Sequence, residues 1–167
     1  FTASEEARMR LETLDSPWSA ERLKEFIKAY FKNRPIYVIT HREPYIHTKT
    51  KNGTLCNTVA SGAIAALQSV MEACGGTWLA YGSGSADRET ADKDGKILVP
   101  PDEPRYTLKR IWLKDKEAKG HYQFSVEAMY TLCLMTHTRP VFRNEDWIDY
   151  RHVNGAFAEE FLENIKG

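Results

Sequence analysis

Two short apolar runs, separated by a helical pattern, constrain the fold of this chain most strongly. The first run, Ile36–Ile39, is rich in β-forming residues and follows Pro35, which is tolerated at the start of a strand. A second such run covers Thr77–Tyr81. Between them, apolar residues recur at helical spacing from Ser61-Gly62 until Gly75-Gly76, a glycine pair typical of a helix end. Strand, helix and strand in this order predict an α/β domain with a largely parallel sheet.

The remaining pattern continues this alternation over one domain. Ser16-Pro17 predicts the start of a helix over about 17 to 32, and Asn52-Gly53 predicts a tight hairpin turn. Further elements are expected as strands at 96 to 99 and 106 to 113, and as helices at Lys114–Gly120, at Ser125–Met135 and from Asn144 onward. We therefore expect a three-layer α/β domain over 17 to 167, preceded by an amino-terminal arm over 1 to 16.

Composition excludes several classes of function. The chain has 167 residues, of which 42% are apolar, enough for one sizeable core. Lysine plus arginine and aspartate plus glutamate number 23 each, so no long-range basic field for nucleic-acid binding is expected. The apolar runs are too short to span a membrane, and no signal-peptide pattern occurs. The sequence predicts a cytoplasmic protein with neither a nucleic-acid nor a membrane partner, and leaves its oligomeric state open.

Cysteine and histidine spacing argues against a metal site. The three cysteines, Cys56, Cys74 and Cys133, lack the paired spacing of zinc ligands and are expected as free thiols. The five histidines show no metal-ligand spacing either, so a structural or solvent-facing role is expected for each. No metal and no cofactor are predicted.

Polar residues follow both central strands, where parallel sheets usually bind ligands. Arg42 follows the first strand, and the polar stretch Gly82–Glu89, expected to be flexible, follows the second. An arginine fork at such an edge is suited to an anion, although a surface ion pair is the alternative. Asp87 and Glu89 are expected to order their loop rather than to catalyse a reaction.

Several blocks, taken together and in one order, resemble a known family. They are Arg42-Glu43-Pro44-Tyr45-Ile46-His47, Ala60-Ser61-Gly62, Cys74-Gly75-Gly76-Thr77-Trp78, Gly82–Glu89, Tyr122-Gln123-Phe124-Ser125, His137–Phe142, and Trp147, Tyr150 and Asn154. This order is similar to the amino-terminal lobe of trehalose-6-phosphate synthases, and the resemblance covers nearly all of the chain beyond about residue 16.

The resemblance implies a retaining glycosyltransferase with two Rossmann-like lobes (GT-B), of which this chain is the acceptor-side lobe. The family transfers glucose from a nucleotide sugar, usually UDP-glucose, to glucose 6-phosphate. The implied partners are therefore a nucleotide sugar, a phosphorylated sugar acceptor and a carboxyl-terminal lobe of the same protein. The family's catalytic residues would lie in that second lobe, so no catalytic residue is assigned here and the fragment alone is expected to be inactive.

Site residues follow from the resemblance position by position. Arg42 matches the arginine that binds the acceptor phosphate, and Gly62 matches the glycine beside the donor diphosphate; for Gly62 an ordinary helix start is the alternative. His121 occupies the place of an acceptor-contacting aromatic residue, and Tyr130 that of a sugar-positioning tryptophan. His41 replaces the asparagine that commonly precedes the arginine.

These departures cluster around one predicted acceptor pocket. Besides His41, His121 and Tyr130, Val126 replaces a family asparagine and so loses an amide. The changes leave two alternatives beside trehalose 6-phosphate synthesis. One is a glucosyltransferase with another phosphorylated acceptor, such as glycerol 3-phosphate, and the other is a noncatalytic sugar-phosphate-binding or regulatory module.

Overall fold

The computed structural model of the chain describes residues 19–31, 34–134 and 138–166. The chain divides into two compact units, Phe1–Arg110 and Ile111–Gly167, and each is described by itself. The predicted arm over 1 to 16 lies outside the described residues, and a single lobe over 17 to 167 stays a prediction.

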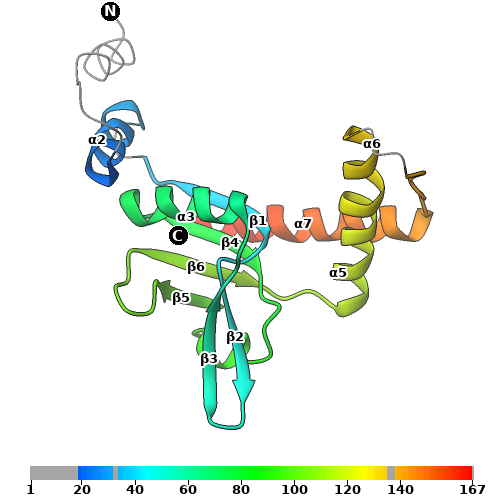
Figure 1. Cartoon of the computed structure of the whole chain (residues 1–167), viewed down its shortest axis with the longest axis horizontal. Coiled ribbons are helices and arrows are strands. Elements are labelled where there is room, and N and C mark those ends of the chain that lie inside the picture. The colour runs from blue at the N-terminus through cyan, green and yellow to red at the C-terminus, as the bar shows by residue number, and fades with distance from the viewer. Residues whose placement is uncertain (1–18, 32–33, 135–137, 167) are drawn as a thin grey trace, which may run out of the picture. The chain divides into compact units, whose positions relative to one another are not determined.

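A four-stranded sheet organises the first unit (Figure 1). Its strands are β1 (Tyr37–Arg42), β4 (Thr77–Tyr81), β5 (Lys96–Val99) and β6 (Tyr106–Ile111), in the order β1-β4-β6-β5. β1 and β4 are parallel, with Tyr37 opposite Thr77, whereas β5 pairs antiparallel with β6 at the edge. The fold is thus α/β, with a mostly parallel sheet flanked by helices, and Rossmann-like, as the sequence predicts.

Helix α3 (Gly62–Cys74) connects the parallel strands β1 and β4 and buries its apolar face on the sheet. Ile64 and Met71 join a core with Trp78, Val99 and Leu108, all less than 5% exposed. Helix α2 (Ala20–Phe31) contacts α3. Ser19 caps α2 through its hydroxyl, which accepts a hydrogen bond from Arg22 N–H; the predicted Ser16-Pro17 start lies outside the described residues.

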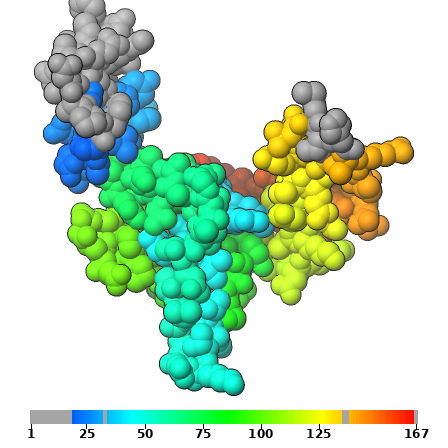
Figure 2. Space-filling view, viewed as in Figure 1, coloured from blue at the N-terminus to red at the C-terminus, as the bar shows by residue number. Residues whose placement is uncertain are grey.

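A β-hairpin interrupts the connection from β1 to α3. It consists of β2 (Tyr45–Thr50) and β3 (Gly53–Thr58), and Figure 2 shows it projecting from the remainder of the first unit. The predicted hairpin is therefore confirmed, but its two-residue loop is Lys51-Asn52. Gly53 begins β3 at a φ of +126°, a conformation that favours glycine.

The second unit is helical. Helix α5 (Asp115–Tyr122) continues without a break into a π-helix, η1 (Gln123–Tyr130), and a short α6 (Thr131–Cys133), and α7 (Asn144–Lys166) contacts α5. The prediction that Gly120 ends a helix is wrong. Gly120 instead allows close packing, because a Cβ atom there would lie 2.4 Å from the Asp149 carboxylate.

The described residues contain neither a membrane-spanning helix nor a cluster of metal-ligand side chains. No helix among them combines the length and apolar character needed to cross a bilayer. No group of three or more His, Cys, Asp or Glu side chains among them is placed to hold a metal ion.

Candidate functional site at the carboxyl edge of the sheet

A β-bulge ends strand β1 at the edge of the sheet where β1 and β4 both terminate. Thr40 pairs with Ala80 and Arg42 pairs with Tyr81, so His41 is the extra residue. Bulges redirect the side chains beside them. The Thr40 hydroxyl holds the bulge at His41 in place, because it donates a hydrogen bond to the Arg42 carbonyl at 2.6 Å and accepts one from Trp78 Nε1 at 2.7 Å.

The bulge presents Arg42 to solvent. Its side chain is exposed, and within the described part of the chain no hydrogen bond or ion pair engages its guanidinium. His41 is half-buried, with its ring centroid 5.5 Å from that of Tyr81. Burial, followed by the charge of Arg42, lowers the pKa of His41, so its imidazole is neutral at neutral pH. Of the two predicted acceptor residues on β1, Arg42 is therefore an exposed cation and His41 a neutral ring beside it.

A cluster of buried charged groups joins the ends of several strands, and one of its members, Glu43, directly follows Arg42 in the chain. Arg110, at the end of β6, is 1% exposed, and Glu43 and Asp87 are no more exposed than this. Arg110 Nε donates to Glu43 Oε2 at 2.8 Å, and Arg110 Nη2 lies 3.0 Å from Asp87 Oδ1. One guanidinium thus lies between two carboxylates that are separated from it by 67 and 23 positions in the chain.

The rest of the Arg110 guanidinium is saturated by neutral acceptors. Nη2 donates to the Tyr45 carbonyl at 3.1 Å and contacts His47 Nδ1 at 2.8 Å, while Nη1 donates to Thr90 Oγ1 at 3.2 Å. Since Arg110 can only donate, His47 Nδ1 is the acceptor and its imidazole is neutral. Burial, and next the Arg110 charge, lower the pKa of His47 accordingly. His47, 6% exposed, has the structural role expected from the sequence.

The stretch after β4 is anchored by the same carboxylates. Glu43 Oε1 accepts from Ser83 N–H at 2.9 Å, and Asp87 accepts from Gly84 N–H at 2.6 Å and from His47 N–H at 2.8 Å. The sequence predicts a flexible loop here, whereas Asp87 begins a short helix, α4 (Asp87–Thr90), and is fully buried, as is Ala86. The prediction that Asp87 orders this segment is confirmed.

Gly84 allows this anchoring, so its replacement by alanine should destabilise the unit. A Cβ atom at residue 84 would lie 2.3 Å from the His47 carbonyl oxygen and 2.8 Å from the Asp87 carboxylate. The backbone must move to relieve that overlap, and we expect Gly84→Ala to lower the free energy of unfolding by about 1 to 3 kcal/mol in urea denaturation. Gly155→Ala is the matched control, because open space surrounds that helical glycine; an equal loss in both variants would contradict the steric explanation.

Gly62 begins α3 at the same edge of the sheet, since the helix returns antiparallel to β1 (Figure 1). Ser61, which precedes it, has an extended backbone and makes no side-chain capping hydrogen bond, and the first turn contains no acidic residue. A Cβ atom at Gly62 would meet nothing within 4 Å. The start of α3 therefore lacks a side-chain cap from Ser61, and its N–H groups and dipole favour an anion.

The other two predicted acceptor residues belong to the second unit. His121, at the end of α5, is 9% exposed, and its ring stacks on that of Tyr150 with centroids 5.2 Å apart. Tyr130, at the end of η1, is 59% exposed. That these two residues face the same ligand as Arg42 and His41 stays a prediction. π-Helical turns such as η1 are frequent at functional sites.

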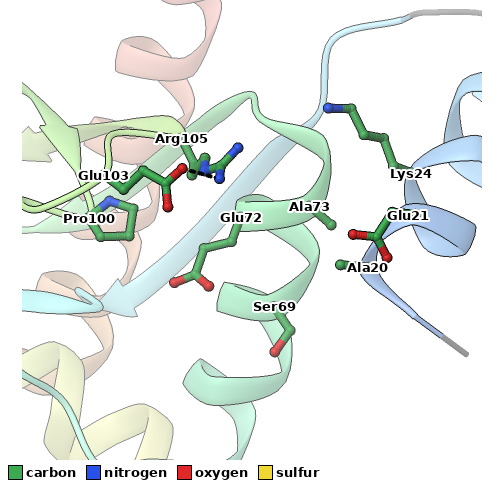
Figure 3. A pocket seen from close by; sticks show the side chains of 9 residues that line it. All are labelled: Ala20, Glu21, Lys24, Ser69, Glu72, Ala73, Pro100, Glu103 and Arg105. Atoms are coloured by element: carbon green, nitrogen blue, oxygen red, sulfur yellow. Dashed lines mark hydrogen bonds and ion pairs between the residues drawn. The ribbon is translucent and has the colours of Figure 1, made fainter.

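A cavity of about 480 Å³ lies away from this edge, between α2, the last turns of α3 and the segment from β5 to β6 (Figure 3). Its charged residues are Glu21, Lys24, Glu72, Glu103 and Arg105, and Arg105 forms an ion pair with Glu103. Three carboxylates against two cations disfavour a phosphate dianion. The exposed guanidinium of Arg42 is better suited to binding a phosphate dianion.

Sequence comparison finds one distant similarity. No family profile matches the chain. Over 136 residues, 80% of its length, the chain is 25% identical to an α,α-trehalose-phosphate synthase [UDP-forming] of Schizosaccharomyces pombe (strain 972 / ATCC 24843). The chain spans 26% of the length of that protein, which is consistent with one lobe of a larger enzyme. The chain is thus distantly similar to part of a trehalose-phosphate synthase.

Proposed function

We propose that the chain is the acceptor-binding lobe of a retaining glucosyltransferase that makes trehalose 6-phosphate from a nucleotide-glucose, such as UDP-glucose, and glucose 6-phosphate. The observation that supports this most is Arg42, an exposed guanidinium without a described partner at the carboxyl edge of a mostly parallel sheet. Ligands of such sheets bind at this edge. Arg42 would bind the acceptor phosphate through charge-assisted, paired hydrogen bonds.

The start of α3, which has no side-chain cap from Ser61, supports a second phosphate position. Gly62 and the N–H groups after it would receive the donor diphosphate, because Ser61 makes no capping hydrogen bond to them and a side chain is lacking at residue 62. A second lobe would bind most of the nucleotide and would supply the catalytic groups. The lobe described here would then position the acceptor hydroxyl, which is an orienting role rather than a chemical one.

Replacing Arg42 by alanine tests this proposal. A hydrogen bond to a charged group contributes about 1.5 to 3 kcal/mol, so Arg42→Ala should bind glucose 6-phosphate about 10- to 150-fold more weakly in calorimetric titration. Arg105→Ala is the matched control, since Arg105 is also exposed but already pairs with Glu103. Equal affinities of the wild type and Arg42→Ala would remove Arg42 from the phosphate site.

A different phosphorylated acceptor is the second candidate, and the bulge at His41 favours it. The His41 ring packs beside Tyr81 next to Arg42, at the position where the family commonly has a smaller amide. A shorter acceptor, such as glycerol 3-phosphate, would need less room there. Tighter binding of glycerol 3-phosphate than of glucose 6-phosphate, with both lost in Arg42→Ala, would support this candidate.

A noncatalytic sugar-phosphate module would bind the acceptor without turnover by the full-length protein.

A further inference from the structure

Arg42 and Glu43 are consecutive residues whose side chains differ sharply in burial. The Arg42 side chain is exposed, whereas Glu43 is 1% exposed and points into the buried cluster with Arg110 and Asp87. The Glu43 carboxylate therefore belongs to the residue that directly follows the proposed phosphate-binding cation in the chain.

The buried cluster has one carboxylate more than its single cation can neutralise. Arg110 Nε donates to Glu43 at 2.8 Å, and Arg110 Nη2 lies 3.0 Å from Asp87. With both carboxyl groups ionised the cluster has a net charge of −1, and with Glu43 protonated it is neutral. A buried excess charge is costly, which favours the neutral state.

We propose that Glu43 is a positioning residue of the Arg42 site, whose uptake of a proton neutralises the Glu43–Arg110–Asp87 cluster and strengthens anion binding at Arg42. This inference rests on the proposed function of Arg42. It makes acceptor affinity dependent on pH near neutrality, through a group that does not touch the ligand.

The surroundings of Glu43 support this assignment. Burial, followed by the Asp87 carboxyl, raises the pKa of Glu43 to about 7, although Arg110 and Ser83 N–H oppose the rise. The other ionisable groups that face the cluster are His47 from β2, Cys56 from β3, Asp87 from α4 and Arg110 from β6. Burial lowers the pKa of His47 and raises that of Cys56, so both stay neutral at neutral pH.

One nearby group outside the cluster must be separated from Glu43. His41 precedes Arg42, and its protonation would also attract an anion, but burial lowers its pKa from 6.5. Above pH 6.5 the change in charge is therefore that of Glu43. Because the pKa of Glu43 is raised to about 7, Glu43 takes up its proton as the pH falls from 8.5 to 6.5, and anion affinity should rise over this range.

Inorganic sulfate is the appropriate probe, because it stays a dianion over this range whereas a phosphate monoester titrates near pH 6. We expect the Arg42-dependent affinity for sulfate to be about 3- to 10-fold higher at pH 6.5 than at pH 8.5 at low salt. Glu43→Gln should show no such slope, because its amide cannot ionise. Glu103→Gln, which removes an exposed carboxylate paired with Arg105, should keep the wild-type slope.

The outcomes separate this inference from the proposed function. Equal slopes in the wild type and Glu43→Gln would overturn the role of Glu43, while Arg42 would remain the anion site. Sulfate binding that is unchanged in Arg42→Ala would overturn the proposed site itself, whatever the slope.

A measurement on the unaltered protein covers the case in which Glu43→Gln fails to fold. Linkage is reciprocal, so sulfate must raise the pKa of Glu43 by the same factor by which protonation strengthens sulfate binding. The side-chain carboxyl ¹³C shift of Glu43, followed by NMR between pH 4 and 9, should titrate at a higher pH with saturating sulfate than without it. A midpoint that sulfate leaves unchanged would refute the coupling.

Discussion

Replacing Arg110 by methionine is expected to lower the free energy of unfolding of the first unit by about 3 to 5 kcal/mol, because it leaves two buried carboxylates without their cation. Glu43 and Asp87 are each about 1% exposed or less and cannot reach water to compensate. Urea denaturation at pH 7.5 measures this change. Arg105→Met, which removes an exposed arginine paired with Glu103, should cost less than about 1 kcal/mol.

The loss of free energy of unfolding in Arg110→Met, relative to the wild type, should also depend on pH. Arg110 opposes the effect of burial on the pKa of Glu43, so removing Arg110 raises that pKa further. A carboxyl group whose folded pKa exceeds its unfolded value binds more protons in the folded state, and stability then falls as the pH rises. We expect a smaller deficit at pH 5 than at pH 8. A deficit below about 1 kcal/mol at both pH values would contradict a buried, uncompensated pair.

Replacing Trp78 by alanine is expected to cost a comparable amount, about 3 to 5 kcal/mol, through loss of the largest side chain of the core. Trp78 is fully buried, its ring lies 6.0 Å from that of Tyr106, and its Nε1 donates to the Thr40 hydroxyl that fixes the bulge. Chemical denaturation measures the change. Leu98→Ala is the control on the neighbouring strand pair, since that leucine is 61% exposed.

Trp78→Phe separates packing from the hydrogen bond. It keeps an aromatic ring but removes the donor to Thr40, so it should cost less than the alanine variant and should still weaken glucose 6-phosphate binding by loosening the Arg42 end of β1. Losses of stability of similar size in Trp78→Ala and Leu98→Ala would contradict the position of Trp78 in the core.

Local patterns sufficed to predict the elements that form the sheet. The apolar runs before Arg42 and at Thr77–Tyr81 became β1 and β4, and the glycine pair after Cys74 ended α3 as expected, because these signals lie within a few residues of the structure they specify. The prediction that a helix ends at Gly120 was wrong because it rested on a local pattern. The helix-ending tendency of Gly120 is outweighed by its close packing against Asp149, 29 positions further along the chain.

The buried cluster could not be predicted from local patterns, because its members come from distant segments. Arg110 and Glu43 are 67 positions apart. One signal was present: Lys109 and Arg110 lie in a largely buried strand, and a charged residue in such a strand requires a buried partner. The sequence does not indicate which carboxylate that partner is. The bulge at His41 was missed too, since it depends on the pairing of β1 with β4.

Backbone amide mapping by NMR tests the central claim, phosphate binding at Arg42, most directly. Glucose 6-phosphate titrated into the labelled protein should shift the amides of His41, Arg42 and Glu43 most strongly, and Arg42→Ala should abolish those shifts. Shifts confined to the cavity lined by Lys24, Glu72 and Arg105, or shifts at the edge that persist in Arg42→Ala, would contradict it.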